Sequence, residues 1–253
     1  MNNIMPIKSL TVAALLTLVF GLSAHAAPVT KGATVINQEK SVSDTLSIRQ
    51  QAIPLIAASM ASGQMKKLNG ALNQGLDDGL TINEAKEILV QLYAYTGFPR
   101  SLNALSELMK VVEVRKQRGI KDVEGKMPVS PVPTGDELRC IGTANQTTIS
   151  GAPVQGPLFD FAPVINQFLQ THLFGDIFAR DNLDWQSREL ATVGALAAMP
   201  GVEAQLLSHT RASMRVGLTA AQLRQLVQIL REHGDNEAAM RAEHALQQAL
   251  ANK

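Results

Sequence analysis

Cysteine is almost absent from this sequence, and aromatic residues are scarce. Cys140 is the only cysteine among 253 residues, so no disulfide can form within one chain. The same count excludes redox cycling between two thiols of one chain. Aromatic residues make up 4% of the sequence, whereas apolar residues make up 45%, as in an ordinary globular protein. Because alanine, leucine, glutamine and methionine are abundant, we predict an all-α fold.

The chain also lacks an excess of charge of either sign. Its 23 basic and 22 acidic residues leave a net charge of +1, and the two kinds are interspersed. Such a surface offers no field of one sign to a nucleic acid, and we expect no nucleic-acid partner. The five histidines form no closely spaced cluster with carboxylates, so we expect no metal site.

No apolar run reaches the roughly 20 residues that a membrane-spanning helix needs. The longest run, Leu10–Leu22, follows Lys8 and precedes the small residues Ala24 and Ala26. This order is typical of a secretory signal peptide at residues 1–26. We therefore expect cleavage after Ala26, a periplasmic or secreted mature protein, and no membrane partner after cleavage. An uncleaved inner-membrane anchor is the alternative.

The remaining sequence is mostly patterned as helices. Residues 27–46 are polar and aperiodic, which predicts a flexible arm. Thr81–Gly97 is the clearest helix, with apolar residues three and four apart, a cap and a glycine stop. A second helix follows at Pro99–Gly119. Residues 120–157 collect proline, glycine and threonine without a period, which predicts a long connection. Helical patterning resumes near Phe161.

Two parts of the chain repeat each other. Lys66–Thr81 aligns with Ala204–Thr219, and both segments end in Gly-Leu-Thr. Leu89–Gly97 then aligns with Leu226–Gly234, with a shift of one residue. Each Gly-Leu-Thr predicts a helix stop followed by a threonine cap for the next helix. Two matched blocks at nearly the same separation indicate a duplication.

The duplication predicts a first copy at residues 47–119 and a second at residues 158–253. His209 in the second copy aligns with Ala71 in the first. The shared fold therefore does not need an imidazole at this position. We infer that His209 serves something specific to the second copy.

Three segments resemble the carboxymuconolactone decarboxylase family, which belongs with the alkyl hydroperoxidase D-like proteins. Leu183–Leu223 resembles its central motif, in which Leu-Asp, an arginine, a histidine and Gly-Leu-Thr follow one another. His172–Leu190 resembles the entry segment of the family. Gly79–Leu105 resembles the other half of the domain, with Tyr-x-Gly-x-Pro. The resemblance implies two tandem helical copies packed as a pseudo-dimer, and a homo-oligomer that is a trimer of these double-length chains.

The family contains a thiol-dependent branch whose label is alkyl hydroperoxidase or peroxiredoxin activity. This chain could carry the label of that branch but not its chemistry. The branch uses Cys-x-x-Cys followed four residues later by histidine. Here Val202 and Gln205 are the nearest positions before His209, and neither is a cysteine. A disulfide-cycling peroxidase needs both an attacking and a resolving thiol.

The decarboxylase branch implies acid/base chemistry without a thiol, a metal or another cofactor. Loss of CO2 from a carboxylated lactone requires a proton donor, which His209 can supply because imidazole titrates near neutral pH. Glu189 is expected to orient His209 or an arginine. Gln205 lies one helical turn before His209 and is expected to bond the ring or the substrate.

Four further residues complete the expected site. Arg180 and Arg188 are candidate clamps for a substrate carboxylate, since guanidinium groups bind carboxylates through paired hydrogen bonds. Tyr95 is expected to reach in from the first copy, unless it is a core residue. His172 is either a substrate-binding residue or a capping or interface residue.

The other site residues also have structural interpretations. His209 either acts in chemistry or bridges helices, and Glu189 either orients it or satisfies a helix N-terminus. Arg188 either binds substrate or forms a surface ion pair with Asp184. The aromatic residues at near-helical spacing are predicted to be core: Phe174, Phe178 and Trp185.

The expected export narrows the choice of substrate. The lactone of this family is broken down inside the cell, where an exported enzyme would not meet it. We therefore expect a small anionic carboxylated lactone or keto-acid-like compound rather than that lactone. The alternative is a non-catalytic protein that binds a small molecule or takes part in an assembly, with His209 as a polar anchor.

Overall fold

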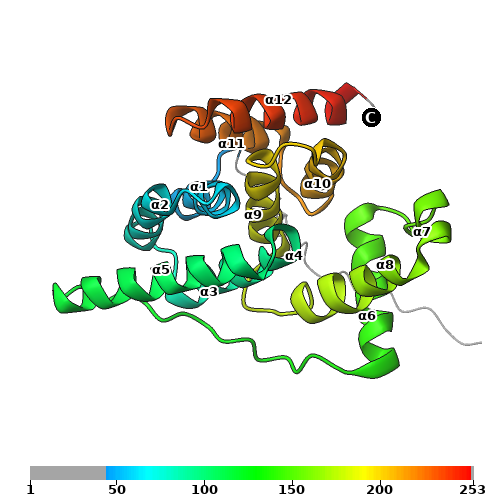
Figure 1. Ribbon diagram of the computed structural model, residues 1–253, viewed down its shortest axis with the longest axis horizontal. Helices are drawn as coiled ribbons and strands as arrows, with labels where there is room; N and C mark the ends of the chain where they lie inside the picture. Colours follow the sequence, from blue (N-terminus) through cyan, green and yellow to red (C-terminus); the bar gives the residue numbers. More distant parts are fainter. Residues whose placement is uncertain (1–43, 252–253) are drawn as a thin grey trace, which may run out of the picture. The chain divides into compact units, whose positions relative to one another are not determined.

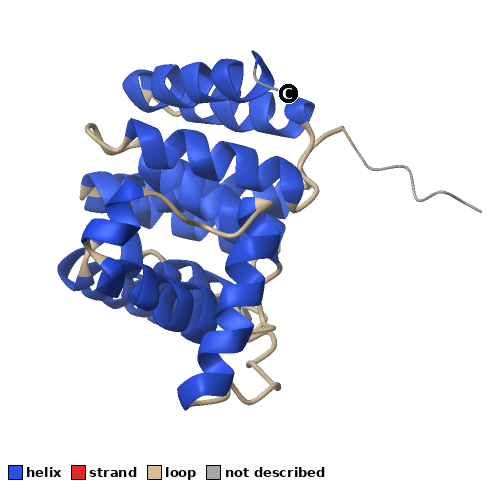
Figure 2. Ribbon diagram, turned by 90° about the vertical axis from the view of Figure 1, so that its right-hand side faces the viewer, coloured by secondary structure: helices blue, strands red, loops and turns tan. Residues whose placement is uncertain are grey.

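The computed structural model describes residues 44–251, which are all helix, turn or loop with no strand (Figure 2). The chain divides into two units, residues 1–41 and 42–253, and the description below concerns the second. The expected signal peptide and most of the expected arm lie outside the described residues. The prediction of an all-α fold is confirmed for the described part. None of its helices is long and apolar enough to cross a membrane.

Twelve α-helices and one π-helix make up the described unit (Figure 1). They are α1 (Ile48–Ser62), α2 (Met65–Asp77), α3 (Ile82–Gln91), α4 (Tyr93–Thr96), α5 (Phe98–Gln117), α6 (Gly135–Ser150), α7 (Pro157–Phe161), α8 (Pro163–Phe168), η1 (Leu169–Ile177), α9 (Trp185–Ala197), α10 (Glu203–Arg215), α11 (Ala220–Glu232) and α12 (Asn236–Ala251).

Helices α1 and α9 form the centre of the unit and pack directly on each other. Residues 52–61 of α1 and 187–197 of α9 are buried without interruption, as expected for helices that are covered on every side. Gly194 permits the close approach. A Cβ atom built there would lie 2.8 Å from both the Cα and the carbonyl oxygen of Pro54.

The predicted stop-and-cap pattern is confirmed at both Gly-Leu-Thr sequences. Gly79 has a φ of +93° and Gly217 a φ of +103°, a region that glycine adopts without steric cost. Thr81 and Thr219 then each accept a hydrogen bond from the third residue of the next helix, whose side chain bonds back to the threonine N–H. These reciprocal capping boxes begin α3 and α11.

Two predicted boundaries were wrong. The single helix expected at Thr81–Gly97 is divided at Leu92 into α3 and α4. The arm expected at residues 27–46 does not extend to its last residue, because Leu46 is buried in the core. The N–H of Leu46 donates to Gln225 Oε1 at 2.7 Å, so both packing and a hydrogen bond hold the chain there.

The predicted connection at residues 120–157 is not without structure, since α6 occupies its second half. This helix packs against η1 and α10. At Gly142 the backbone of η1 comes so close that a Cβ would lie 1.7 Å from the carbonyl oxygen of Gln170. The threonines and glycines of α6 have weak helix propensity, so contacts with distant elements, which the local pattern does not reveal, stabilise it.

Replacing Gly194 with alanine tests the α1–α9 contact. Because the added methyl meets backbone atoms of Pro54, we expect a loss of about 1–3 kcal/mol in the free energy of unfolding, measured by urea denaturation. Gly70→Ala is the matched control, since a Cβ there has nothing within 4 Å. It is expected to be neutral or to stabilise by up to about 1 kcal/mol. Equal stability of the two variants would contradict the close approach.

Candidate active site

His209 projects from α10 toward α9 and pairs with a buried carboxylate. Its Nδ1 lies 2.9 Å from Oε2 of Glu189. The His209 side chain is 15% exposed and that of Glu189 is fully buried. An ionised carboxylate in this place accepts a hydrogen bond from Nδ1–H and so favours the tautomer in which Nε2 is the basic nitrogen. Nε2 has no hydrogen-bond partner among residues 44–251.

Tyr95 reaches the same imidazole from α4. Its ring meets the His209 ring edge-on, with the centroids 5.4 Å apart and the planes at 82°. Burial, followed by the negative charge of Glu189, raises the pKa of Tyr95 and outweighs the opposing effect of the nearby Thr192 hydroxyl, so the phenol stays neutral; no Tyr95–Thr192 contact meets hydrogen-bond geometry. Within the described part, neither the Tyr95 hydroxyl nor Oε1 of Glu189 has a hydrogen-bond partner. Since buried polar atoms are normally paired, these two oxygens are exceptions within the site.

Arg188 binds the carboxylate of Glu87, a residue of this chain, and not that of a substrate. The side chain is fully buried, and Nη2 donates to Glu87 Oε1 at 2.9 Å. Nη1 donates to Gln91 Oε1 at 3.0 Å. The interpretation as a surface ion pair with Asp184 is therefore wrong. These two hydrogen bonds link α9 to α3. The expected binding of a substrate carboxylate by Arg188 has no support in them.

Arg180 shares the same carboxylate and is more open. Its Nε donates to both oxygens of Glu87, at 2.9 and 3.1 Å, and its side chain is 33% exposed. The two terminal nitrogens have no hydrogen-bond partner in the part of the chain that the structure describes. Arg180 lines a cavity of about 430 Å³ together with Pro131, Pro133, Phe178, Asp184 and Trp185.

Glu87 is the residue of this region that the sequence analysis missed. Its buried carboxylate accepts bonds from Arg180, Arg188 and the Nδ2 of Asn182. Burial raises the pKa of Glu87, but the Arg180 hydrogen bond, the Arg188 charge and the Asn182 bond outweigh it and lower the pKa. The one signal available was that Glu87 and Gln91 are polar residues one turn apart beside the apolar face of their helix.

Within residues 44–251, the remaining predicted site residues form no hydrogen bond, ion pair or ring contact with the His209–Glu189–Tyr95 group. Gln205 is exposed and makes no side-chain hydrogen bond to any other described residue. Nδ1 of His172 lies 2.7 Å from Oδ2 of Asp176, and the His172 ring tilts against Tyr93. The prediction that aromatic residues form a core is confirmed by a cluster with two of them buried and one partly buried: Phe174, Phe178 and Trp185.

Neither a metal cluster nor a thiol pair accompanies this site. Within residues 44–251, no three histidine, cysteine, aspartate or glutamate side chains are grouped to hold a metal ion. Cys140 is exposed on α6. The groups available for chemistry are therefore an imidazole, a carboxylate, a phenol and the free end of one guanidinium.

Residues 163–248 match the family model described as the carboxymuconolactone decarboxylase family. The match contains His209, Glu189 and both arginines, whereas Tyr95 and Glu87 lie outside it. No curated protein matches the chain significantly. The match supports the family resemblance for residues 163–248. It does not by itself establish an activity for this chain.

Glu87→Gln tests the buried charge group. Because the pKa of Glu87 is lowered from 4.5, its ionised form stabilises the fold above pH 4.5, and this contribution is lost as the pH falls further. We expect the variant to lose about 3 kcal/mol at pH 7, with the difference from the unmodified protein shrinking below pH 4.5. Unfolding by urea across pH 3–7 measures both.

The control for this prediction is Glu124→Gln, which removes an exposed partner of Lys86. Exposed pairs contribute about 0–1 kcal/mol, so a small and nearly pH-independent change is expected. A Glu87 variant that behaves like this control would contradict the buried group.

Proposed function

We propose that this chain is a carboxymuconolactone decarboxylase-like protein that uses His209 and Glu189 for acid/base chemistry on a small carboxylated lactone or keto-acid-like substrate. The observation that carries the proposal is the 2.9 Å pair between His209 Nδ1 and the fully buried Glu189. A buried carboxylate behind one ring nitrogen prepares the other nitrogen to give or take a proton. The matched family supports the reaction class.

We further propose that the unit is two copies of one domain. Helices α1, α2 and α3 have the same order as α9, α10 and α11, and the same capping boxes begin α3 and α11. The central α1–α9 contact joins the two copies in the manner of a pseudo-dimer. Only one composite site results, because His209 comes from the second copy and Tyr95 from the first. A trimer of such chains, exported after signal cleavage, completes the proposal.

The chemistry assigns a role to each group. When the carboxylate of such a substrate leaves as CO2, its bonding electron pair passes into the neighbouring carbonyl system and forms an enolate. In this proposal the Tyr95 hydroxyl donates to the enolate oxygen. The protonated Nε2 of His209 then delivers a proton to the carbon, and Glu189 stabilises the imidazolium before that step. Arg180, whose terminal nitrogens have no partner in the described residues, is the group proposed to hold a substrate carboxylate, in the cavity that it lines.

A second candidate is a non-catalytic protein that binds the same class of compound. The unpaired Tyr95 hydroxyl and Glu189 Oε1 favour it equally, because a ligand can bond both without reacting. The thiol-dependent peroxidase finds no such support, since the single cysteine lies exposed on α6.

His209→Gln separates catalysis from binding. If His209 transfers the proton, turnover falls about 10²- to 10⁴-fold while ligand affinity changes by no more than about a few-fold. CO2 release from a panel of carboxylated lactones and β-keto acids measures turnover, and calorimetry measures affinity. The control is His244→Gln, which alters an exposed histidine of α12. Saturable binding with no turnover in either protein would establish the binder instead.

Arg180→Met tests the carboxylate clamp. Hydrogen bonds to charged groups contribute about 1.5–3 kcal/mol, so affinity for carboxylates is expected to fall roughly 10- to 100-fold. Affinity for the methyl esters of the same compounds is expected to stay within about twofold. Equal losses for acids and esters would show that Arg180 acts only through the Glu87 pair.

A further inference from the structure

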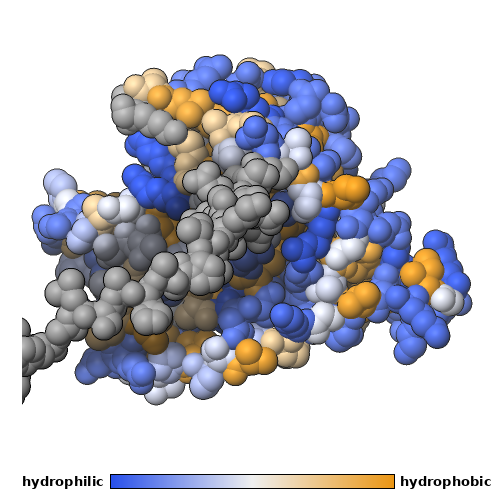
Figure 3. All heavy atoms as spheres, turned by 180° about the vertical axis from the view of Figure 1, so that it is seen from behind, coloured by the Kyte–Doolittle hydropathy of each residue, from blue (hydrophilic) through white to orange (hydrophobic). Residues whose placement is uncertain are grey.

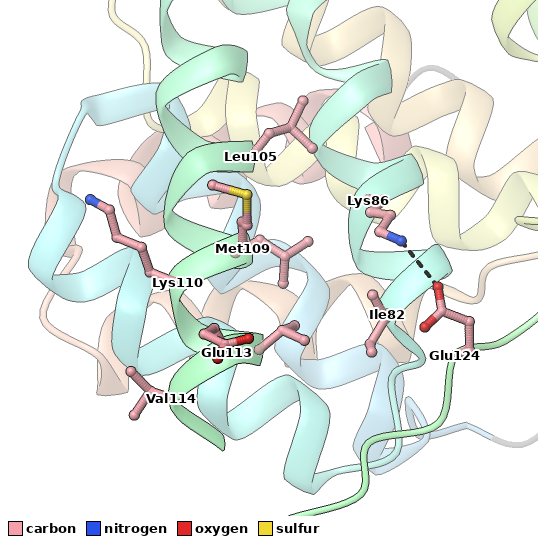
Figure 4. A pocket seen from close by; sticks show the side chains of 10 residues that line it. Ile82, Lys86, Leu105, Met109, Lys110, Glu113, Val114 and Glu124 are labelled. Carbon is pink, nitrogen blue, oxygen red and sulfur yellow. Dashed lines mark hydrogen bonds and ion pairs between the residues drawn. The ribbon is translucent and has the colours of Figure 1, made fainter. Parts of the chain in front are cut away.

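Exposed apolar side chains do not by themselves identify what binds to a surface. Figure 3 shows several apolar patches among hydrophilic residues on one face. A cavity of about 770 Å³ lies between α5 and α3 (Figure 4). Within the described part of the chain, each charged residue of its lining already has a partner: Lys86 with Glu124, Lys110 with Glu107, and Glu113 with Gln117. This cavity therefore presents no charged group that lacks a partner.

The cavity at Arg180 differs, because its one cation has donors to spare. It encloses about 430 Å³. Arg180 Nε is held by the buried carboxylate of Glu87, and neither terminal nitrogen has a hydrogen-bond partner among residues 44–251. Much of the lining is apolar: Pro131, Val132, Pro133, Phe178, Leu183 and Trp185. A fixed guanidinium beside apolar walls is complementary to a carboxylate attached to an apolar body.

The walls of this cavity favour a ring over a flexible chain. Trp185 is held in place, because its Nε1–H donates to the carbonyl oxygen of Phe178 at 3.1 Å. The Phe178 ring is held in turn, with the guanidinium carbon of Arg188 over it at 5.7 Å from its centroid. Fixed walls bind a rigid ligand best, since a rigid ligand loses little conformational freedom on binding. A ring also buries more apolar area than a short open chain.

Two carboxylates of the chain restrict the charge of the ligand. Asp181 and Asp184 line the same cavity. Asp184 accepts hydrogen bonds from the N–H and the hydroxyl of Ser187, at 2.8 and 3.1 Å. The hydroxyl of Ser130 and the N–H of Val129 bond to Asp181 and lower its pKa, so this carboxylate stays ionised at neutral pH. One cation beside two anions accepts a ligand with a single carboxylate and disfavours a second.

One wall of the cavity belongs to a proline-rich segment, residues 126–133, which we call the proline strap. It is part of the long loop between α5 and α6 in Figure 1. Asp181 accepts the N–H groups of Val129 and Ser130, each at 3.0 Å, and the Ser130 hydroxyl at 2.6 Å. Within residues 44–251 the strap makes no other hydrogen bond. Because proline fixes φ, holding Val129 and Ser130 also places residues 131–133.

We propose that the Arg180 cavity binds a single carboxylate attached to a rigid ring, with the ring against the proline strap and Trp185. Asp181 is a positioning residue, which holds the strap for this contact. The inference rests on the proposed function only in taking Arg180 as the carboxylate clamp. Among the compounds proposed there, the cavity selects ring-bearing lactone acids over open-chain keto acids.

The cavity can be observed directly, because Trp185 is the only tryptophan of the chain. Its emission is titrated in the full chain with benzoate and cyclohexanecarboxylate, with open-chain acetoacetate, and with the dicarboxylate phthalate. Both ring monocarboxylates are expected to change the emission saturably and to bind about 10-fold or more tightly than acetoacetate or phthalate. No change in emission with any probe, or equal affinity for benzoate and either of the other two, overturns the proposal.

A parallel assay of CO2 release separates this proposal from the proposed function. A tryptophan response without CO2 release from any carboxylated lactone or keto acid leaves the binding site in place and overturns only the acid/base reaction. CO2 release without a tryptophan response overturns the binding site and leaves the reaction in place.

Asp181→Asn tests the strap. An amide has one acceptor oxygen where the carboxylate has two, so the strap loses part of its attachment. Without ligand, quenching of Trp185 emission by acrylamide is expected to rise about twofold, because the cavity opens more often. Affinities for cyclohexanecarboxylate and for its methyl ester are expected to fall alike, by about fivefold or more. Arg180→Met, in contrast, weakens binding of the acid alone.

Two further variants control this test. Ser130→Ala removes only the 2.6 Å bond and is expected to change quenching and affinity in the same direction but less. Asp160→Asn is the matched control, because Asp160 is exposed on α7 and its side chain bonds to no described residue. Circular dichroism checks that all variants keep the helical fold. If Asp181→Asn and Ser130→Ala both behave like Asp160→Asn, the positioning role of Asp181 is overturned.

Discussion

The buried carboxylate of Glu87 is the interaction on which the position of the site depends. It joins α3 to Arg188 of α9 and to Arg180 just before α9. A charge left unpaired there would cost several kcal/mol, so the helices cannot slide past each other without breaking the group. With Arg188 held on one side of α9, the next residue, Glu189, points about 100° further around the helix. That direction leads to α10 and His209.

The short helix α4 has a comparable effect on the aromatic residues. Because α3 ends at Gln91 and Leu92 interrupts the helix, a new helical turn begins with Tyr93 and carries Tyr95 two residues later. Residues two apart lie on nearly opposite sides of a helix. The Tyr93 ring accordingly meets His172 and stacks on Phe98, while the Tyr95 ring meets His209. One interruption in a helix thus supplies a ring to the candidate site and another to the surface at the start of α5.

The features that the sequence predicted are those whose physical causes lie within a few residues. The caps at Thr81 and Thr219 each need only the next three residues. Glu87 was missed because its arginine partners lie 93 and 101 residues further along the chain. Helix α6 was missed because its stability comes from the close approach of η1 at Gly142. The sequence left Glu189 to orient either His209 or an arginine, because no local pattern joins residues on two helices, and only the 2.9 Å contact with His209 Nδ1 decides between them.

Under the proposed duplication, the two halves of the unit differ at the position of the imidazole. The second half has His209 where the first has Ala71. A duplicated fold would not need an imidazole in both copies. A histidine in only one half therefore points to a function of the assembled chain rather than to the stability of either copy.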